Sequence, residues 1–286
     1  RNYLFESYLK VVQHYKPRVF VFENVPGILS AKPGDGSVRI IDLIQKAFAD
    51  AGYAVLPDLS NAIIDMTEYG VPQNRKRIII LGVSKEHYGD KAEAMVEKFY
   101  SSYLPEYKIE KKATVRDAIG DLPKLRPLDE PISYLGRKLS HSVSDPLING
   151  HISRFHNKRD IELFKFLEED IASGRMKYTS AKSLKTLYTK LTGKTSNVHK
   201  YYVLRWDEPS NLIPAHLFKD GLRHIHPDPE QARTITVREA ARLQTFPDNY
   251  YFNCSQTDAF KMIGNAVPPL FAKKVAYAIY HLIQEN

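Results

Sequence analysis

The sequence contains a single cysteine, Cys254, among 286 residues. One cysteine can form neither an internal disulfide nor a cysteine zinc cluster, and this scarcity fits a reducing compartment. No apolar run approaches the roughly 18 residues that a membrane-spanning helix needs. No signal-peptide pattern precedes the opening segment RNYLFESYLKVV, whose apolar residues fall at helical spacing. We therefore expect neither a disulfide-stapled secreted protein nor a membrane partner.

An initiator methionine is also missing. The first residue is Arg1, and the helical pattern starts at once. We expect the chain to begin inside a domain, either as a fragment or as part of a longer protein.

Acidic residues are absent between Ile171 and Arg205. The chain has a net charge of +8, and the eight cations of this segment account for all of it. Tyrosines and hydroxyl residues are interleaved with the cations. Cations for phosphates mixed with aromatic and hydroxyl groups suit a nucleic-acid surface, although a solvated lysine-rich face is the alternative. The cations are Arg175, Lys177, Lys182, Lys185, Lys190, Lys194, Lys200 and Arg205.

The first third of the chain alternates helix and strand patterns. Residues 18–22 (RVFVF), 53–56 and 77–83 (RIIILGV) are typical of strands, with amphipathic helical segments between them. This alternation predicts an α/β doubly wound sheet in which residues 18–22 form a central parallel strand.

The pattern changes twice further along the chain. Residues 108–231 lose the regular periodicity, which predicts a second, smaller, loop-rich domain with short strands. In residues 232–286, Thr236 and Glu239 have the spacing of a capping box, and a final helix should start at Pro268-Pro269. We expect three segments: residues 1–107, residues 108–231 as a second domain, and residues 232–286, which return to the first.

Two motifs of the first segment carry candidate chemistry. Glu23-Asn24-Val25-Pro26-Gly27 directly follows a predicted strand, where ligands collect in open α/β sheets. A loop or cap residue is the plainer interpretation of that glutamate. In Gln73-Asn74-Arg75-Lys76-Arg77 the alternate residues Gln73, Arg75 and Arg77 can share one face of an extended segment, and arginines grip phosphates or base oxygens. A surface cluster is the alternative.

Two further motifs lie near the end of the chain. In RTITVREAARLQTFPD, Arg238, Glu239 and Arg242 have helical neighbour spacing and could form surface ion pairs. In Ile263-Gly264-Asn265-Ala266-Val267-Pro268-Pro269 a glycine turn leads into a helix, whose free amides can face a polar ligand.

The order of these motifs is more informative than any one of them. FENVPG, YGVPQNRKR with IIILGV, a variable basic region, RTITVREAARLQTFPD and IGNAVPP together resemble the later motifs of the DNA cytosine-5 methyltransferase family, in its prokaryotic restriction-modification type. The resemblance implies the back part of a Rossmann-like sheet that uses S-adenosylmethionine and no metal. It also implies double-stranded DNA as partner and the prokaryotic cytosol as location.

The resemblance assigns roles to particular residues. Glu23 corresponds to the glutamate that contacts ring nitrogen 3 and the exocyclic amine of a flipped cytosine, and Arg77 and Arg75 to arginines that steady the base oxygen and nearby backbone. Asn24 and Gln73 support this pocket, Asn265 and Val267 close over the methyl donor, and the helix of TVREAARL is structural. Residues 108–231 correspond to the target-recognition region, with candidate DNA contacts at Arg175, Lys177, Lys182, Lys185 and Lys190.

The sequence departs from the family in its early motifs. It has no Phe-x-Gly-x-Gly turn for the methyl donor and no Pro-Cys nucleophile loop, and Cys254 follows FPDNYYF without a preceding proline. The nucleophile is therefore expected in a missing segment or an N-terminal partner chain, and this polypeptide alone should be inactive. A non-catalytic DNA-recognition subunit of a split enzyme and an RNA cytosine-5 methyltransferase remain alternatives.

Overall fold

The computed structural model describes residues 4–32, 36, 38–197, 199–219 and 221–286. The chain forms two compact units. Unit 1 comprises Arg1–Gly70, Arg75–Glu110 and Phe271–Asn286, and unit 2 comprises Val71–Asn74 and Lys111–Leu270. Among the described helices none is both long enough and apolar enough to cross a membrane.

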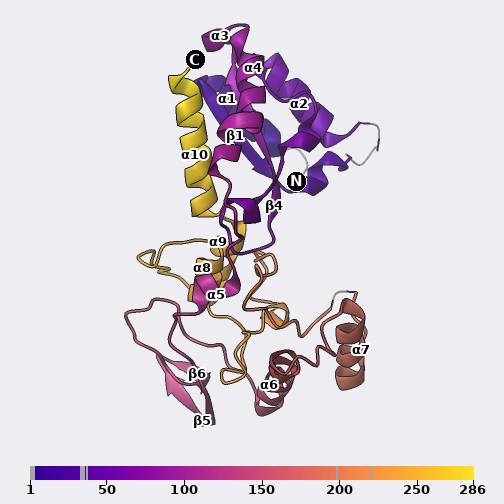
Figure 1. Cartoon of the computed structure of the whole chain (residues 1–286), viewed down its shortest axis with the longest axis vertical. Helices are drawn as coiled ribbons and strands as arrows, with labels where there is room; N and C mark the ends of the chain where they lie inside the picture. Colours follow the sequence, from indigo (N-terminus) through magenta and orange to yellow (C-terminus); the bar gives the residue numbers. More distant parts are fainter. Residues whose placement is uncertain (1–3, 33–35, 37, 198, 220) are drawn as a thin grey trace. The chain divides into compact units, whose positions relative to one another are not determined.

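Unit 1 is built on a four-stranded sheet around β4 (Lys76–Ser84), drawn in Figure 1. β4 pairs with β1 (Val19–Asn24), with β2 (Tyr53–Ala54) and with β3 (Ile63–Asp65), and each of these pairings is antiparallel. The predicted strands at 18–22 and 77–83 are confirmed. The prediction of a central parallel strand is wrong, because an apolar run indicates burial but says nothing about the direction of the neighbouring strand.

One face of this sheet is covered by α1 (Leu4–Tyr15) and α2 (Ile40–Asp50). The Tyr8 ring of α1 contacts Phe20 and Phe22 of β1 and Phe48 of α2. The Phe20 ring also crosses β4 at Gly82, where an added Cβ would lie 2.1 Å from a ring atom. Only glycine leaves room for this packing, which fixes β1 against β4.

The remaining elements of unit 1 complete its core. The predicted final helix is confirmed as α10 (Pro269–Gln284), and the Phe271 ring contacts Tyr69. The Tyr100 hydroxyl donates to the Ile79 carbonyl (2.7 Å) and accepts from the Leu81 amide (2.9 Å) in the middle of β4. The other helical segments are η1 (Pro26–Leu29), η2 (Leu59–Ala62), η3 (Met66–Tyr69), α3 (Lys85–Tyr88), α4 (Lys91–Lys98), η4 (Phe99–Tyr103) and η5 (Pro105–Tyr107).

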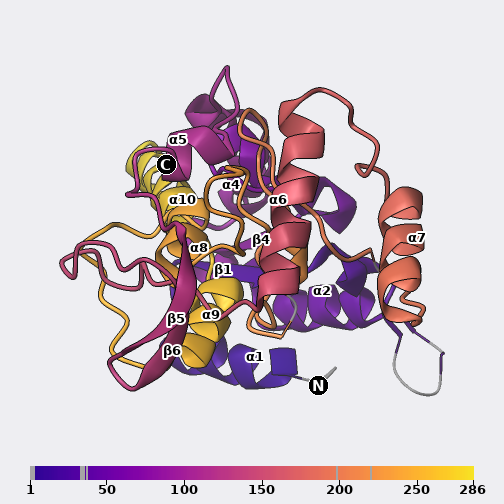
Figure 2. The ribbon, with the colours of Figure 1, turned by 90° about the horizontal axis from the view of Figure 1, so that it is seen from below.

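Unit 2 contains more of the chain than unit 1 and more helix than the sequence indicated. Among its described residues, β5 (Pro127–Tyr134) and β6 (Arg137–His141) form an antiparallel hairpin, which is labelled in Figure 2. A cavity of about 220 Å³ is lined by residues of this hairpin and of α9. The short strands were predicted, whereas the long helices of this unit were not, and the predicted bounds 108–231 stay a prediction. The helices are α5 (Val115–Ile119), α6 (Lys158–Ala172), α7 (Ala181–Thr192), η6 (Gly221–Arg223), α8 (Val237–Leu243) and α9 (Gln256–Asn265).

Two apolar clusters stabilise unit 2. One joins α5, α8 and α9. The other joins α6 to α7 through Phe164, Leu167, Leu184 and Leu187, and packs them on residues 201–232. Since α7 contributes its buried leucines to this second cluster, its opposite face is left for solvent.

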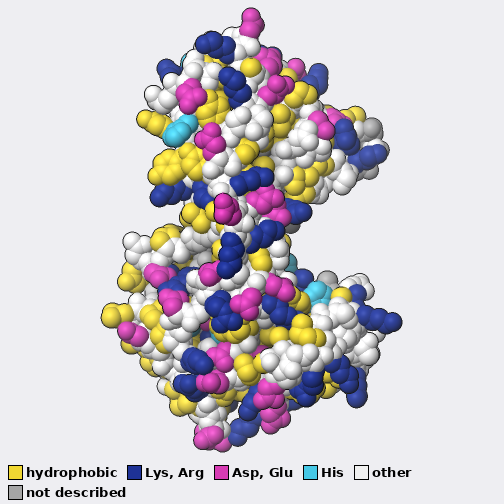
Figure 3. Space-filling model, in the orientation of Figure 1, with side chains coloured by type: hydrophobic (Ala, Val, Ile, Leu, Met, Phe, Trp, Pro, Cys, Tyr) yellow, Lys and Arg dark blue, Asp and Glu magenta, His cyan; other side chains and the backbone are white. Residues whose placement is uncertain are grey.

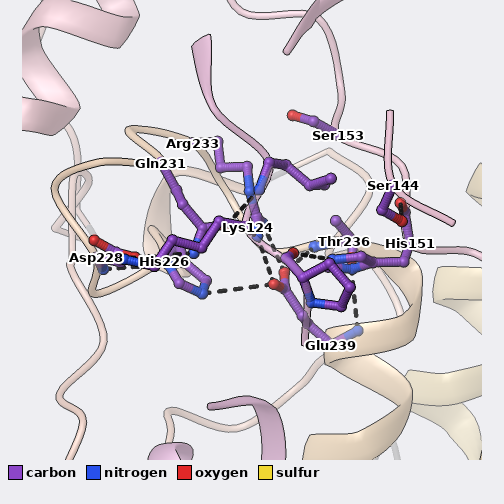
Figure 4. A network of polar contacts seen from close by, with 12 residues as sticks. Lys124, Ser144, His151, Ser153, His226, Asp228, Gln231, Arg233, Thr236 and Glu239 are labelled. Carbon is purple, nitrogen blue, oxygen red and sulfur yellow. Dashed lines mark hydrogen bonds and ion pairs between the residues drawn. The ribbon is translucent and has the colours of Figure 1, made fainter. Parts of the chain in front are cut away.

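A buried ion pair joins Arg233, which follows Ala232 of the second cluster, to Glu239 on α8 of the first cluster. Figure 4 shows the polar network around this pair. The two Nη atoms of Arg233 donate to the two carboxylate oxygens of Glu239 at 2.6 and 2.7 Å, and both side chains are at most 1% exposed. Glu239 also accepts from the Thr236 amide (2.7 Å), so the predicted capping box is confirmed. Burial alone disfavours a charged carboxylate, but the adjacent Arg233 outweighs it and lowers the pKa of Glu239.

Several buried histidines near this ion pair are uncharged at neutral pH. Burial lowers the pKa of His226 to about 3, with the Arg233 charge acting in the same direction. Burial likewise lowers the pKa of His156 to about 3 and that of His141 to about 4. These rings are therefore neutral at pH 7 and act as hydrogen-bonding groups of the core.

Arg242 forms the predicted surface ion pairs, whereas Arg238 is buried and lies 3.8 Å from Asp248. Arg238 is 1% exposed and donates to the carbonyls of Asn149, Pro247 and Tyr250. Arg242 does pair with acids, Asp121 and Asp248. The helical spacing was correct, but it could not show that α8 is enclosed by loops from elsewhere in unit 2.

We expect Glu239→Gln to destabilise unit 2 by about 3–5 kcal/mol, because it leaves the Arg233 charge buried without its carboxylate. The measurement is urea unfolding at pH 7.5, compared with Glu230→Gln. Glu230 is exposed and pairs with Lys124 and Arg126, so its loss should cost less than about 1 kcal/mol. Equal effects of the two substitutions would contradict the assignment of the buried pair as a structural centre.

Candidate functional site

Glu23 and Arg77 lie side by side on one face of the unit 1 sheet. Glu23 is opposite Ile79 in the β1–β4 register, and residues 77 and 79 share a face because strand side chains alternate. The two long side chains are diagonal neighbours across the strands. Arg77 Nε lies 2.9 Å from Glu23 Oε1, and the side chains are 11% and 28% exposed. The predicted convergence of these two groups is therefore present, at the edge of an antiparallel sheet.

Arg75 adds a second cation to this edge. Arg75 is only 2% exposed, and its backbone carbonyl accepts a hydrogen bond of 2.9 Å from the Met66 amide. Burial, as the largest cause, and the neighbouring charge of Arg77 together lower the pKa of Arg75 to about 10, against the opposing effect of the Glu23 charge. Arg75 and Arg77 thus share one electrostatic environment with a single carboxylate, which leaves an excess of positive charge.

Asn24 shapes the loop after β1, while its role as support for a base pocket stays a prediction. Its Oδ1 accepts from the Val25 amide (2.8 Å), and the chain then turns into η1 at Pro26. This hydrogen bond ends the strand directly after Glu23.

Gln73 belongs to unit 2 and is fully buried there. Its Nε2 donates to the Leu243 carbonyl (3.0 Å) and to Gln244, and its Oε1 accepts from the Ile213 amide (3.1 Å). These contacts give the side chain a structural role in unit 2. Its predicted role as support for a base pocket stays a prediction.

Asn265 and Val267, predicted to contact the methyl donor, lie at the end of α9. Gly264 lets this helix end pack closely, because an added Cβ would lie 2.3 Å from the Ala215 amide nitrogen. Asn265 is exposed and Val267 is half-buried. Both side chains are therefore accessible, and their predicted contact with the methyl donor stays a prediction.

The predicted DNA-contacting cations gather on α7 and on the turn before it. Lys182 and Lys190 lie on the exposed face of α7, and Lys185 lies at its side. In the part of the chain that the structure describes, none of these three lysines pairs with an acid. Lys and Arg side chains are visible on the outer surface around α7 in Figure 3. Arg175 and Lys177 precede the helix and are exposed.

The sequence showed hydroxyl residues among these cations but did not place them together on one face of a helix. Thr186 and Thr189 are exposed, four and seven residues after Lys182. Ser180 accepts from the Ser183 amide and caps the helix, and Leu184 and Leu187 are buried. A serine cap followed by leucines at helical spacing was the signal that could have revealed both the helix and its polar face.

Cys254 lies in unit 2 and is exposed. Its sulfur is 3.9 Å from the Met262 sulfur, and it lines the cavity beside the β5–β6 hairpin. Within the described residues no base lies against this thiol.

Comparisons with known proteins identify similar chains along the whole length. The family described as C-5 cytosine-specific DNA methylase matches residues 1–281. The type II methyltransferase M.Bpa9945I of Bacillus paralicheniformis is 36% identical over 99% of this chain and 64% of its own length. The type II methyltransferase M.AgeI of Thalassovita gelatinovora is 31% identical over 98% of this chain and 77% of its own length. The chain thus spans about two thirds to three quarters of these two relatives.

Solved structures agree at the level of fold. A prophage-encoded E. coli protein assigned as a DNA modification methyltransferase superimposes with a TM-score of 0.64 at 22% identity, over 99% of this chain and 74% of that one. The S. pombe Dnmt2 methyltransferase superimposes with a TM-score of 0.51 at 14% identity, over 98% and 72%. The mixed α/β architecture is therefore shared. Since the family match covers nearly the entire sequence, the chain belongs to the C-5 cytosine-specific DNA methylase family.

Proposed function

We propose that this chain holds the target base and reads the DNA in a DNA cytosine-5 methyltransferase of the type II restriction-modification class. The reaction transfers a methyl group to carbon 5 of a cytosine turned out of duplex DNA. The observation that carries the proposal is the 2.9 Å contact between Glu23 and Arg77 at a strand end, in a chain that the family matches over residues 1–281.

The two side chains complement the edge of a cytosine. That edge presents an amine donor, a ring nitrogen and a carbonyl oxygen in a row. Glu23 accepts from the amine and shares a proton with ring nitrogen 3, while Arg77 donates to the carbonyl oxygen. When a nucleophile adds to carbon 6, negative charge moves toward this nitrogen and oxygen. A shared proton and a preorganised guanidinium stabilise that charge where it develops.

Arg75 contributes through charge and position. Because it is buried beside Arg77, it holds positive potential at the base oxygen. Asn24 keeps Glu23 at the strand end through its bond to the Val25 amide. Both residues therefore preorganise the pair before the base arrives.

Other parts of the reaction involve groups outside this pair. S-adenosylmethionine, when bound, supplies the methyl group, and Asn265 and Val267 would hold one side of it. The nucleophile is proposed to come from a Pro-Cys loop outside these residues, in a preceding segment or a partner chain. Cys254 is unsuited to the role, because its thiol lies against the Met262 sulfur and not against a general base.

Unit 2 is proposed to read the DNA. Its segment 171–205 carries eight cations and no acid. Because α7 is anchored through Leu184 and Leu187, the lysines on its other side are free to face phosphates. Residues 108–231 are proposed as the target-recognition region, within which Arg175, Lys177, Lys182, Lys185 and Lys190 contact DNA.

We expect Glu23→Gln to lower kcat for methyl transfer by about 100-fold or more, because glutamine cannot share a proton with the ring nitrogen. The enzyme to be assayed contains this chain together with its Pro-Cys segment. The measurement is incorporation of labelled methyl groups into duplex DNA. Glu93→Gln is the matched control. Glu93 is an exposed glutamate that pairs at 2.6 Å with Lys85, which follows the opposite end of β4 from Arg77. Full activity of Glu23→Gln would overturn the assigned role, and methyl transfer by this chain alone would overturn the proposal that the nucleophile lies elsewhere.

We expect the combined substitutions Lys182→Gln, Lys185→Gln and Lys190→Gln to weaken binding to duplex DNA. The slope of log affinity against log salt concentration should become shallower by about 2–3, since each lost phosphate contact removes about 0.9 from it. Lys46, Lys91 and Lys98, exposed on unit 1, provide the control triple and should leave the slope unchanged. An unchanged slope in the first triple would contradict DNA contact by α7. Stronger competition by transfer RNA than by duplex DNA would favour RNA as the substrate.

A further inference from the structure

The turn between α6 and α7 presents an apolar side chain between two cations. Arg175, Met176 and Lys177 are all exposed, Met176 at 47%. Met176 has a φ of 55°, in the left-handed region that favours glycine. A long apolar side chain is therefore held outward in a conformation that costs free energy.

Hydrogen bonds impose this conformation. The Met176 amide donates to the Asp170 carbonyl (3.1 Å), and the Thr179 hydroxyl donates to the Met176 carbonyl (3.1 Å). The Asp170 carboxylate accepts from the Tyr178 amide (2.9 Å) and lies 3.7 Å from Arg175 Nε. Both backbone polar groups of Met176 are thus fixed, so the turn is preformed.

Asp170 is the anchor of the turn. It lies on α6 and is 2% exposed, whereas Arg175 keeps 60% of its side chain exposed. The buried Asp170 carboxylate accepts from the Tyr178 amide, on the other side of the turn. This bond holds the turn against the apolar cluster of α6 and α7. The strain at Met176 is therefore maintained by the core of unit 2.

Leu135 offers a comparison within the same unit. It is also apolar, exposed (79%) and held at a positive φ of 48°, at the tip of the β5–β6 hairpin. Its turn lies outside the segment 171–205 that lacks acids. The two residues share backbone strain and exposure but differ in the charge around them.

We propose that the Arg175–Lys177 turn is a DNA-reading element, in which Met176 contacts apolar base surface in a groove while Arg175 and Lys177 hold the phosphates on either side. Cations alone explain attachment to the backbone, but phosphates provide no partner for a thioether side chain. Base edges do, since the thymine methyl and the ring carbons are apolar. This inference rests on the proposed function, because it assigns a contact within the DNA-binding surface of unit 2.

The test compares Met176→Gly with Leu135→Gly in the full chain. Glycine adopts a positive φ without strain, so each substitution removes an exposed side chain while preserving its turn. The probe is a fluorescent duplex pool of random sequence, titrated at several salt concentrations. We expect Met176→Gly to raise Kd by about five- to tenfold with an unchanged salt slope, since an apolar contact releases no counterions. Leu135→Gly should bind like the parent chain.

Arg175→Gln and Lys177→Gln complete the test. Each should lower the salt slope by about one, in contrast to Met176→Gly. If the parent chain binds the duplex and Met176→Gly binds equally well, the inference fails while the proposed function stands. If Leu135→Gly weakens binding as much as Met176→Gly, the effect is not specific to this turn and the inference also fails. If the parent chain does not bind the duplex, the proposed function fails together with the inference.

Discussion

The contact between Glu23 and Arg77 depends on the antiparallel pairing of β1 with β4. In that register Glu23 is opposite Ile79, and Arg77 is the next residue of β4 on the same face. A shift of β1 by one residue would turn Glu23 to the Phe20 and Phe22 face, into the aromatic core under α1 and α2. Gly82 secures the register, because the Phe20 ring occupies the space that any larger residue would fill. The candidate chemistry of unit 1 therefore depends on an aromatic ring packed several residues away from it.

In unit 2 as well, buried residues position the exposed groups that we propose to contact DNA. The exposed lysines of α7 are positioned by buried leucines, and the exposed turn before α7 is positioned by buried Asp170. The Arg233–Glu239 pair in turn fixes the segment on which α6 and α7 pack. The exposed cations of this unit are thus held in place by a buried interior.

Local sequence patterns predicted the elements that depend on local physics. The strands at 18–22 and 77–83, the Thr236 capping box and the final helix follow from apolar periodicity and cap chemistry, and the structure contains them. The meeting of Glu23 with Arg77 was also expected, although from motif order and not from spacing. Each of these predictions involved residues near one another in sequence or a known order of motifs.

Other features depended on contacts that no local pattern contains. The direction of β1 relative to β4 is set by a strand more than 50 residues away, so the parallel sheet was predicted wrongly. Arg238 has the spacing of a surface helix residue, yet loops from residues 149, 247 and 250 enclose it. Gln73 alternates with Arg75 and Arg77, yet its amide is bonded within unit 2. The strain at Met176 arises from Asp170, which sequence alone gave no reason to connect with it.

A crystal structure of the enzyme that contains this chain, bound to duplex DNA with its target cytosine, would test the role of the Glu23–Arg77 pair most directly. We expect the cytosine outside the helix, with a Glu23 oxygen within hydrogen-bonding distance, about 2.6–3.2 Å, of its exocyclic amine and Arg77 at the same distance from its carbonyl oxygen. A flipped cytosine held by other residues, with the Glu23–Arg77 contact intact and remote from it, would contradict the proposed mechanism.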